Sequence, residues 1–192
     1  YTTEFKPVEL SSKEQSALDG KLRGLGLNPV DVMPGAARAS AGSDRFDADG
    51  RLVAERYTEA GASREINLSE KELNAMIASN PDLARRFAVD LSTNLASAKL
   101  LVPVDPDFPI MGGKTLRVTA GLELDYRNRQ PVVILHGVSV MGVPIPNAWL
   151  GNLKNVDLVD QFGGNAGFWK SFAAGVESVA ITDGKLRIEL KE

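Results

Sequence analysis

A stretch of alternating residues at positions 116–126 constrains the fold of this chain more than any other feature. Its even positions are Leu, Val, Ala, Leu, Leu and Tyr, and its odd positions are Arg, Thr, Gly, Glu and Asp. A period of two places one apolar face on a core and one polar face in water. Residues 127–130 predict a turn, and residues 132–141 predict the return strand. Because that strand is apolar at nearly every position, we expect both of its faces to be covered.

Two helices are predicted by capping boxes, in which a Ser and a Glu or Gln three residues later bond each other's backbone N–H groups. The first begins at Ser11 or Ser12, with its apolar stripe on Ala17, Leu18, Leu22 and Leu25. The second begins at Ser69 and carries Leu73, Met76 and Ile77. A short third helix is predicted at Asn80-Pro81, because Asn caps well and Pro suits the first helical position.

The rest of the chain predicts further strands and a helical stretch. Strands are expected at residues 89–91 and 95–104, and a helix from Asn147 to Phe162. Another helix is expected to begin at Asn165. A closing hairpin is expected at residues 179–190 because Asp183-Gly184 is a favoured two-residue turn.

The predicted fold class is α+β, with a strongly curved antiparallel sheet wrapped around one or more helices and a helical N-terminal extension. At 192 residues the chain is one domain, or one domain with such an extension. Residues 34–50 are rich in Ala, Gly, Ser and Asp and lack periodicity. We therefore expect a helical segment and loop at 1–50 and the main α+β domain at 51–192.

Charge and cysteine content limit the partners and the chemistry. Twenty-two basic and 25 acidic residues give a net charge of -3, which gives no electrostatic reason to expect nucleic acid as a partner. The absence of cysteine excludes disulfides, thiolate metal sites and cysteine nucleophiles. With a single histidine as well, zinc is not expected.

The compartment is predicted from what precedes the chain. No apolar run approaches the roughly 20 residues that span a bilayer. Because the chain begins with Tyr1 rather than Met, we expect a signal peptide or membrane anchor to have preceded it. The alternative is that the sequence is an internal domain. The first interpretation predicts an extracytoplasmic protein, periplasmic or in the cell envelope, tethered by a removed N-terminal segment.

Gly113-Lys114-Thr115 matches the end of a phosphate-binding loop. That motif requires a glycine five positions before Gly113, where this chain has Phe108. It must also open a helix, whereas the residues that follow have strand periodicity. We interpret it as a glycine turn before a strand.

An acidic run before Gly50 is similar to a calcium-binding loop. With Gly50 as the sixth residue, Arg45 and Arg56 occupy the first and last ligand positions, and both are wrong for a cation. An acidic turn is the better interpretation.

Side chains suited to acid–base catalysis do not form a recognisable constellation. His136 lies within an apolar strand, so we expect a buried histidine with satisfied hydrogen bonds rather than a general base. Glu123 and Asp125 share the polar face of their strand, and we expect them to face solvent. No catalytic residue and no cofactor is therefore predicted, and we expect a protein that is not an enzyme.

Aromatic residues gather between positions 149 and 172, where both tryptophans and three of the seven phenylalanines fall. Such side chains are buried in a core by default. A density this high also suits the lining of a pocket or the cap of a groove. Both interpretations stay open here.

The order of the elements resembles a known family. An extended run ending in Ile66-Asn67-Leu68 leads into the Ser69-to-Ile77 helix, and after several long strands a hairpin closes at residues 181–188. This resembles the membrane-anchored extracytoplasmic bacterial domains of the YpmS and YceB kind, over about residues 65–192. The resemblance implies a fold like the tubular lipid-binding (TULIP) proteins, with an apolar groove between helix and sheet that Leu73 and Ile77 face. It implies no catalytic residue.

Two functions are therefore expected. The first is a tethered, non-enzymatic domain that binds a lipid or another apolar small molecule between the helix and the curved sheet. The second is a structural or interaction domain with a filled core, whose partner is another envelope protein or a second copy. The residues expected to bind the ligand are Leu73, Ile77, Leu122, Leu124, Trp149, Phe168 and Phe172.

Overall fold

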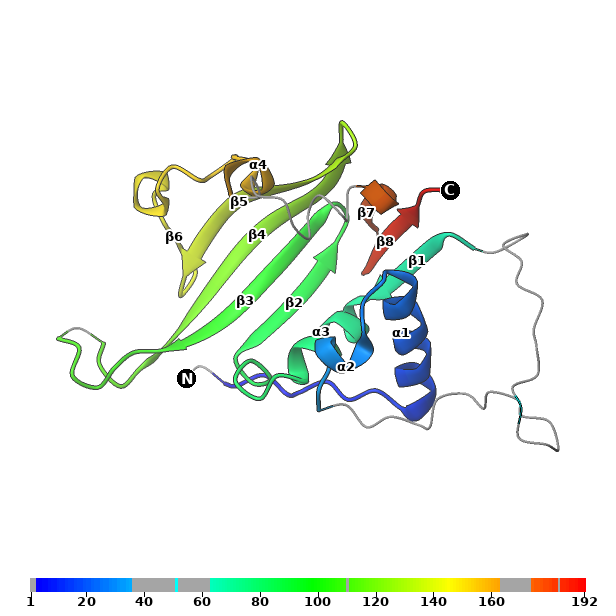
Figure 1. Cartoon of the computed structure of the whole chain (residues 1–192). Coiled ribbons are helices and arrows are strands. Elements are labelled where there is room, and N and C mark those ends of the chain that lie inside the picture. Colours follow the sequence, from blue (N-terminus) through cyan, green and yellow to red (C-terminus); the bar gives the residue numbers. More distant parts are fainter. Residues whose placement is uncertain (1–2, 36–50, 52–62, 110, 163–173, 183) are drawn as a thin grey trace.

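The fold is α+β, with two antiparallel sheets and a small number of helices (Figure 1). The computed structural model describes residues 3–35, 51, 63–109, 111–162, 174–182 and 184–192. The fold class predicted from the sequence is confirmed at this level. The helix expected from Asn165 and the acidic turn before Gly50 lie outside the described residues.

The larger sheet has five strands in the order β2-β3-β4-β5-β6. These strands are β2 (Phe87–Ser92), β3 (Leu95–Pro103), β4 (Thr115–Arg127), β5 (Gln130–Val140) and β6 (Val143–Pro144). The predicted long hairpin is confirmed as β4 and β5, which close on the pair Arg127 and Gln130. Asn128 and Arg129 form the two-residue turn with φ of 52° and 64°. Positive φ at both central residues matches the twist of a tight hairpin.

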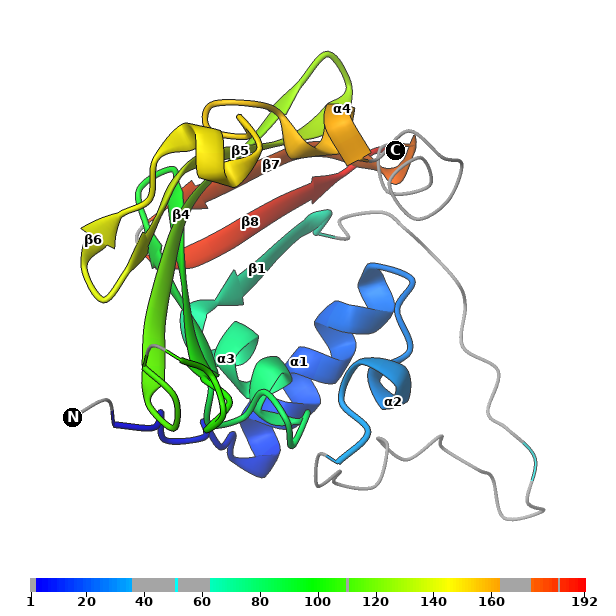
Figure 2. The same ribbon diagram turned by 90° about the vertical axis from the view of Figure 1, so that its left-hand side faces the viewer.

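The smaller sheet joins distant parts of the chain in the order β1-β8-β7. Its strands are β1 (Glu65–Ser69), β7 (Val176–Thr182) and β8 (Lys185–Leu190). The pair β7 and β8 is the predicted closing hairpin, with Gly184 at φ 73° in its turn. In Figure 2, β7 lies on the side of the smaller sheet next to β4 and β5, and β1 lies on the side next to the helix α1 (Ser12–Gly24).

Both predicted capping boxes are present. Ser11 caps α1 (Ser12–Gly24) with Glu14, and Ser69 caps α3 (Glu70–Ala78) with Glu72. A short helix, α2 (Pro29–Val32), follows α1. One hydrophobic core joins these helices to the smaller sheet. Its buried members are Leu18, Leu22, Met33, Ile66, Leu68, Ala75, Val176, Val179 and Ile188.

A second, smaller core joins the two sheets. Ile181 of β7 has no exposed surface and packs with Leu91 and Ala96 of the larger sheet. Leu73 of α3 packs against both cores, so α3 lies where they meet. The Tyr126 hydroxyl donates a hydrogen bond of 2.7 Å to the carbonyl oxygen of Val176, which ties the end of β4 to the start of β7.

Two predicted helices are wrong. Residues 81–86 form turns, because the chain must be extended again from Phe87 to pair with β3. The expected long helix from Asn147 is two short ones, the 3₁₀ helix η1 (Asn147–Leu150) and α4 (Leu158–Phe162). Gly151 adopts the left-handed conformation with φ 64° after η1, which ends the helix there.

Candidate functional site

One face of the larger sheet is apolar across three strands. The even-numbered residues of β4 pair with apolar residues on both sides. Val118 lies between Leu100 and Val140, and Ala120 between Ala98 and Val138. Side chains of directly paired residues point to the same face of a sheet. The face predicted from the alternation in β4 therefore continues onto β3 and β5.

Only one half of this face is covered by the described elements. Leu122 and Leu124 pack against the second core, beneath Ile181 of β7. Further along the same face the side chains are partly exposed, and none belongs to either hydrophobic core of the described residues. We call this half the open apolar face. Its members are Ala98, Leu100, Val102, Leu116, Val118, Ala120, Val138 and Val140.

A β-bulge explains why β5 departs from the sequence prediction. Gly121 pairs with Gly137 and Leu122 pairs with Leu135, so His136 is an extra residue in β5. The extra residue switches the face on which the following side chains lie. His136 therefore shares the polar face of β4, whereas Val138 lies on the apolar face.

His136 is consequently not a core residue. Its side chain is 47% exposed, and its Nε2 lies 2.7 Å from Glu123 Oε2. The expectation that both faces of β5 are covered is confirmed for its first half, where Val132 and Leu135 are buried on opposite faces, and is wrong from His136 onward. The imidazole lies on the polar face beside Glu123, and the bulge moves Val138 and Val140 to the apolar face.

The carboxylates expected in solvent belong to a small ion-pair network. Arg127 binds Glu123 Oε1 at 3.2 Å and Asp125 Oδ2 at 2.5 Å. The Tyr126 backbone N–H and the Arg127 guanidinium hold the pKa of Asp125 below its usual value, although slight burial opposes them. Every charged group in this network is paired. Among the described residues, no Ser, Thr or Tyr hydroxyl forms a hydrogen bond with His136. The network suits the stabilisation of the hairpin.

The described residues among those predicted to bind a ligand lie in different places. Leu73, Leu122 and Leu124 pack at the second core, and Ile77 is partly buried on α3. Trp149 of η1 is 77% exposed. Phe168 and Phe172 lie outside the described residues. The ligand-binding residues predicted on β4 were Leu122 and Leu124 alone, although the even-numbered apolar face of residues 116–126 pointed to the whole strand.

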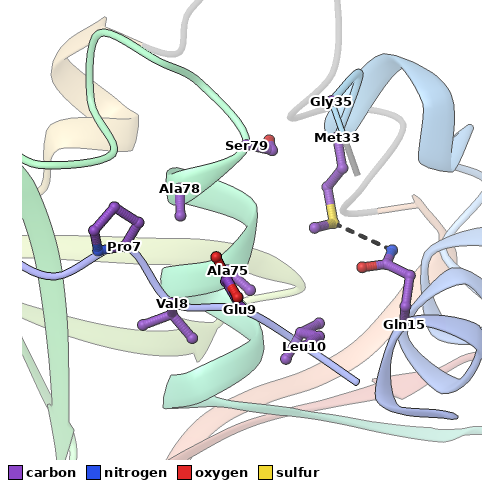
Figure 3. A pocket seen from close by; sticks show the side chains of 10 residues that line it. All are labelled: Pro7, Val8, Glu9, Leu10, Gln15, Met33, Gly35, Ala75, Ala78 and Ser79. Carbon is purple, nitrogen blue, oxygen red and sulfur yellow. Dashed lines mark hydrogen bonds between the residues drawn. The ribbon is translucent and has the colours of Figure 1, made fainter. Parts of the chain in front are cut away.

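A separate pocket lies between the N-terminal segment, α1, α2 and α3 (Figure 3). Its volume is about 340 Å³, within the usual range of small-molecule sites. Most of the lining residues are apolar in type, but about half of the exposed wall is polar, and the buried Gln15 lies on one side. Its lining residues are Pro7, Val8, Glu9, Leu10, Gln15, Met33, Gly35, Ala75, Ala78 and Ser79. No sequence feature pointed to it, since its walls come from four segments.

Comparison with known proteins adds no identity. No protein-family model matches the chain, and no similar curated protein or solved structure was found. Within the part of the chain that the structure describes, no helix is both long enough and apolar enough to cross a membrane. The same residues hold no cluster of His, Asp and Glu side chains that could bind a metal ion.

Proposed function

We propose that this protein is a non-enzymatic binding domain that holds an apolar ligand, such as a lipid acyl chain, along the open apolar face. The observation that carries the proposal is the apolar ladder of Leu100, Val118 and Val140, which continues beyond the core that β7 covers. A large contiguous patch of exposed apolar surface commonly marks a binding site, whereas single exposed apolar residues do not.

The chemistry of this face favours an acyl chain over a polar ligand. The residues of the open apolar face are all Ala, Val or Leu, so they offer no side-chain hydrogen bond. Binding would come from burial of apolar surface, about 25 cal/mol per Å² before the entropy of immobilising the ligand. Strands 9 to 13 residues long give the face the elongated outline that suits a chain-like ligand.

The proposal includes the arrangement predicted from the sequence, in which a curved sheet wraps around a helix. Its support is the position of α3, which packs between β1 and β2 and whose Asn74 amide bonds the backbone of Val89 in β2. It also keeps an extracytoplasmic, membrane-tethered location. Fractionation of cells that express the whole gene tests the location independently of ligand binding.

A fluorescence titration with cis-parinaric acid tests the binding. Val118→Asp places a charge on the open apolar face, whereas Thr119→Asp places the same charge on the opposite face of the same strand. We expect Val118→Asp to abolish binding and Thr119→Asp to leave it within about twofold of wild type. Equal effects of the two variants, or no binding by wild type together with no lipid in native mass spectra of the purified protein, would refute the proposal.

An interaction domain is the second candidate. Large apolar side chains are exposed beside the end of β5, with Met141 at 52%, Val143 at 64% and Trp149 at 77%. Aromatic and Met side chains are enriched at protein–protein interfaces. Sedimentation equilibrium that shows a dimer in wild type and a monomer in Trp149→Ser would favour this function.

A further inference from the structure

We propose that the pocket between the N-terminal segment, α1 and α3 binds a small organic ammonium ion with a short apolar body. The site is separate from the open apolar face. It combines several apolar side chains with two side-chain acceptors that have no donor among the described residues, and these acceptors determine the class of ligand.

Gln15 supplies the first acceptor. Its side chain is 96% buried, since only 4% of its surface is exposed. Its Nε2 donates to Asp19 Oδ1 at 2.8 Å and to the sulfur of Met33 at 3.8 Å, which uses both amide hydrogens. Its Oε1 accepts no hydrogen bond from the described part of the chain, and Figure 3 shows this oxygen turned toward the pocket. This oxygen is therefore an open acceptor for a ligand that supplies a donor.

The amide orientation of Gln15 follows from its neighbours. Asp19 Oδ1 and the Met33 sulfur are both acceptors, so the group that faces them must be the NH₂. If the oxygen and nitrogen of the Gln15 amide were exchanged, Oε1 would face the Asp19 carboxylate, and two acceptors would be in contact. The oxygen is therefore the atom that faces the pocket.

Glu9 supplies the second acceptor at the rim. It lines the pocket and is exposed, and its carboxylate has no hydrogen bond or ion pair within the described residues. The hydroxyl of Ser79 already donates to the carbonyl oxygen of Met76 at 2.7 Å, so it offers only lone pairs. Among the residues that the structure describes, no Lys, Arg or His lines the pocket. Its three described polar side chains, Glu9, Gln15 and Ser79, therefore offer acceptors to a ligand, and one of them is anionic.

These features match an alkylammonium ion. An ammonium group carries three donors and one positive charge, so it can bond Gln15 Oε1 and lie near Glu9. The apolar part of the ligand would contact Val8, Leu10 and Ala78. A carboxylate of the same size would meet a carbonyl oxygen and an anion, and the pocket should reject it.

Methyl NMR with n-hexylamine tests the site, with hexanoate as the probe of opposite charge. In wild type at neutral pH we expect saturable shifts of the Met33, Ala75 and Ala78 methyls with n-hexylamine. Hexanoate should bind at least about tenfold more weakly. Glu9→Gln should weaken n-hexylamine binding about threefold, as for an exposed ion pair. Asp160→Asn, a charge change at an exposed residue outside the pocket, should leave it unchanged.

Ala78→Phe fills the pocket and should abolish n-hexylamine binding, while Val118→Asp should leave it unchanged. Because Glu9 is exposed and makes no bonds, Glu9→Gln keeps the test valid even where Ala78→Phe fails to fold. Absence of methyl shifts, equal affinity for hexanoate, or binding unaffected by Glu9→Gln would each overturn the proposal. These results do not depend on binding of cis-parinaric acid, so failure of this site is distinguishable from failure of the open apolar face.

Discussion

Lys21 of α1 donates hydrogen bonds to both carboxylate oxygens of Glu72 in α3, at 2.7 and 2.9 Å, across 51 positions of the sequence. The Glu72 side chain is only 10% exposed. Burial raises its pKa, but the Lys21 ammonium and the hydrogen bonds from Ser69 outweigh burial and lower the pKa. This ion pair joins the N-terminal helix to the capping box of α3.

Lys21→Met should lower the free energy of unfolding by about 1–3 kcal/mol, because it leaves the mostly buried Glu72 carboxylate without its cation. Lys13→Met, on the exposed side of the same helix, should change it by less than about 0.5 kcal/mol. Urea unfolding at neutral pH measures both variants. An equal loss in the two would show that the ion pair contributes nothing specific.

Acid should remove a second contact between the same helices. Lys71 lies 2.6 Å from Glu14 Oε1, and this hydrogen bond, with those from Ser11, lowers the pKa of Glu14 from 4.5 to about 2. A carboxyl group whose pKa is lower in the folded than in the unfolded state stabilises the fold at pH values above the unfolded pKa. That stabilisation is lost as the pH falls toward the folded pKa and the group binds a proton. We therefore expect the wild type to lose stability relative to Glu14→Gln as the pH falls from about 4.5 toward 2. Urea midpoints of the two proteins across this range measure the difference, and parallel curves would contradict the prediction.

The two halves of the apolar face should differ in their response to the same substitution. Leu122→Ala removes a side chain packed against the second core and should cost about 2–4 kcal/mol. Leu116→Ala removes one on the open apolar face and should cost less than about 1 kcal/mol. Thermal or urea unfolding of the two variants compares them directly. Similar losses would mean that Leu116 also lies under a cover.

Two glycines should differ for a geometric reason. A Cβ on Gly112 would lie 2.7 Å from the carbonyl oxygen of Phe108 and closer still to that of Pro106. A Cβ on Gly121 would meet only ordinary contacts, at 3.8 Å from His136 and 3.9 Å from Leu95. Gly112→Ala should therefore cost about 1–3 kcal/mol, and Gly121→Ala should be neutral or stabilising by up to about 1 kcal/mol. Urea unfolding measures both, and the reverse order would refute this view of the loop before β4.

Local chemistry made part of the fold predictable. The Ser–Glu capping boxes located the starts of α1 and α3, and the alternation in β4 located the central strand, because these signals depend on neighbours within a few residues. The helix expected at Asn80-Pro81 failed because pairing of β2 with β3 overrides a local preference for helix. The bulge at His136 was invisible for a similar reason, since it depends on the register with β4.

The site was less predictable than the fold. The buried stripe of α1 is Gln15, Leu18, Asp19 and Leu22, at ideal helical spacing, but hydrophobicity alone identified only the two leucines. The spacing itself was the signal that could have identified Gln15. How far the apolar face extends depends on where β7 ends above β4, which no local pattern encodes.

Photo-crosslinking with a diazirine fatty acid, followed by peptide mapping, tests the central claim most directly. The account predicts labels on β3, β4 and β5 at the open apolar face, with Val118, Val138 and Val140 among the modified residues, and no label on Thr119 or Ser139 of the opposite face. Labels confined to the pocket near Gln15, or spread evenly over both faces of the sheet, would contradict it.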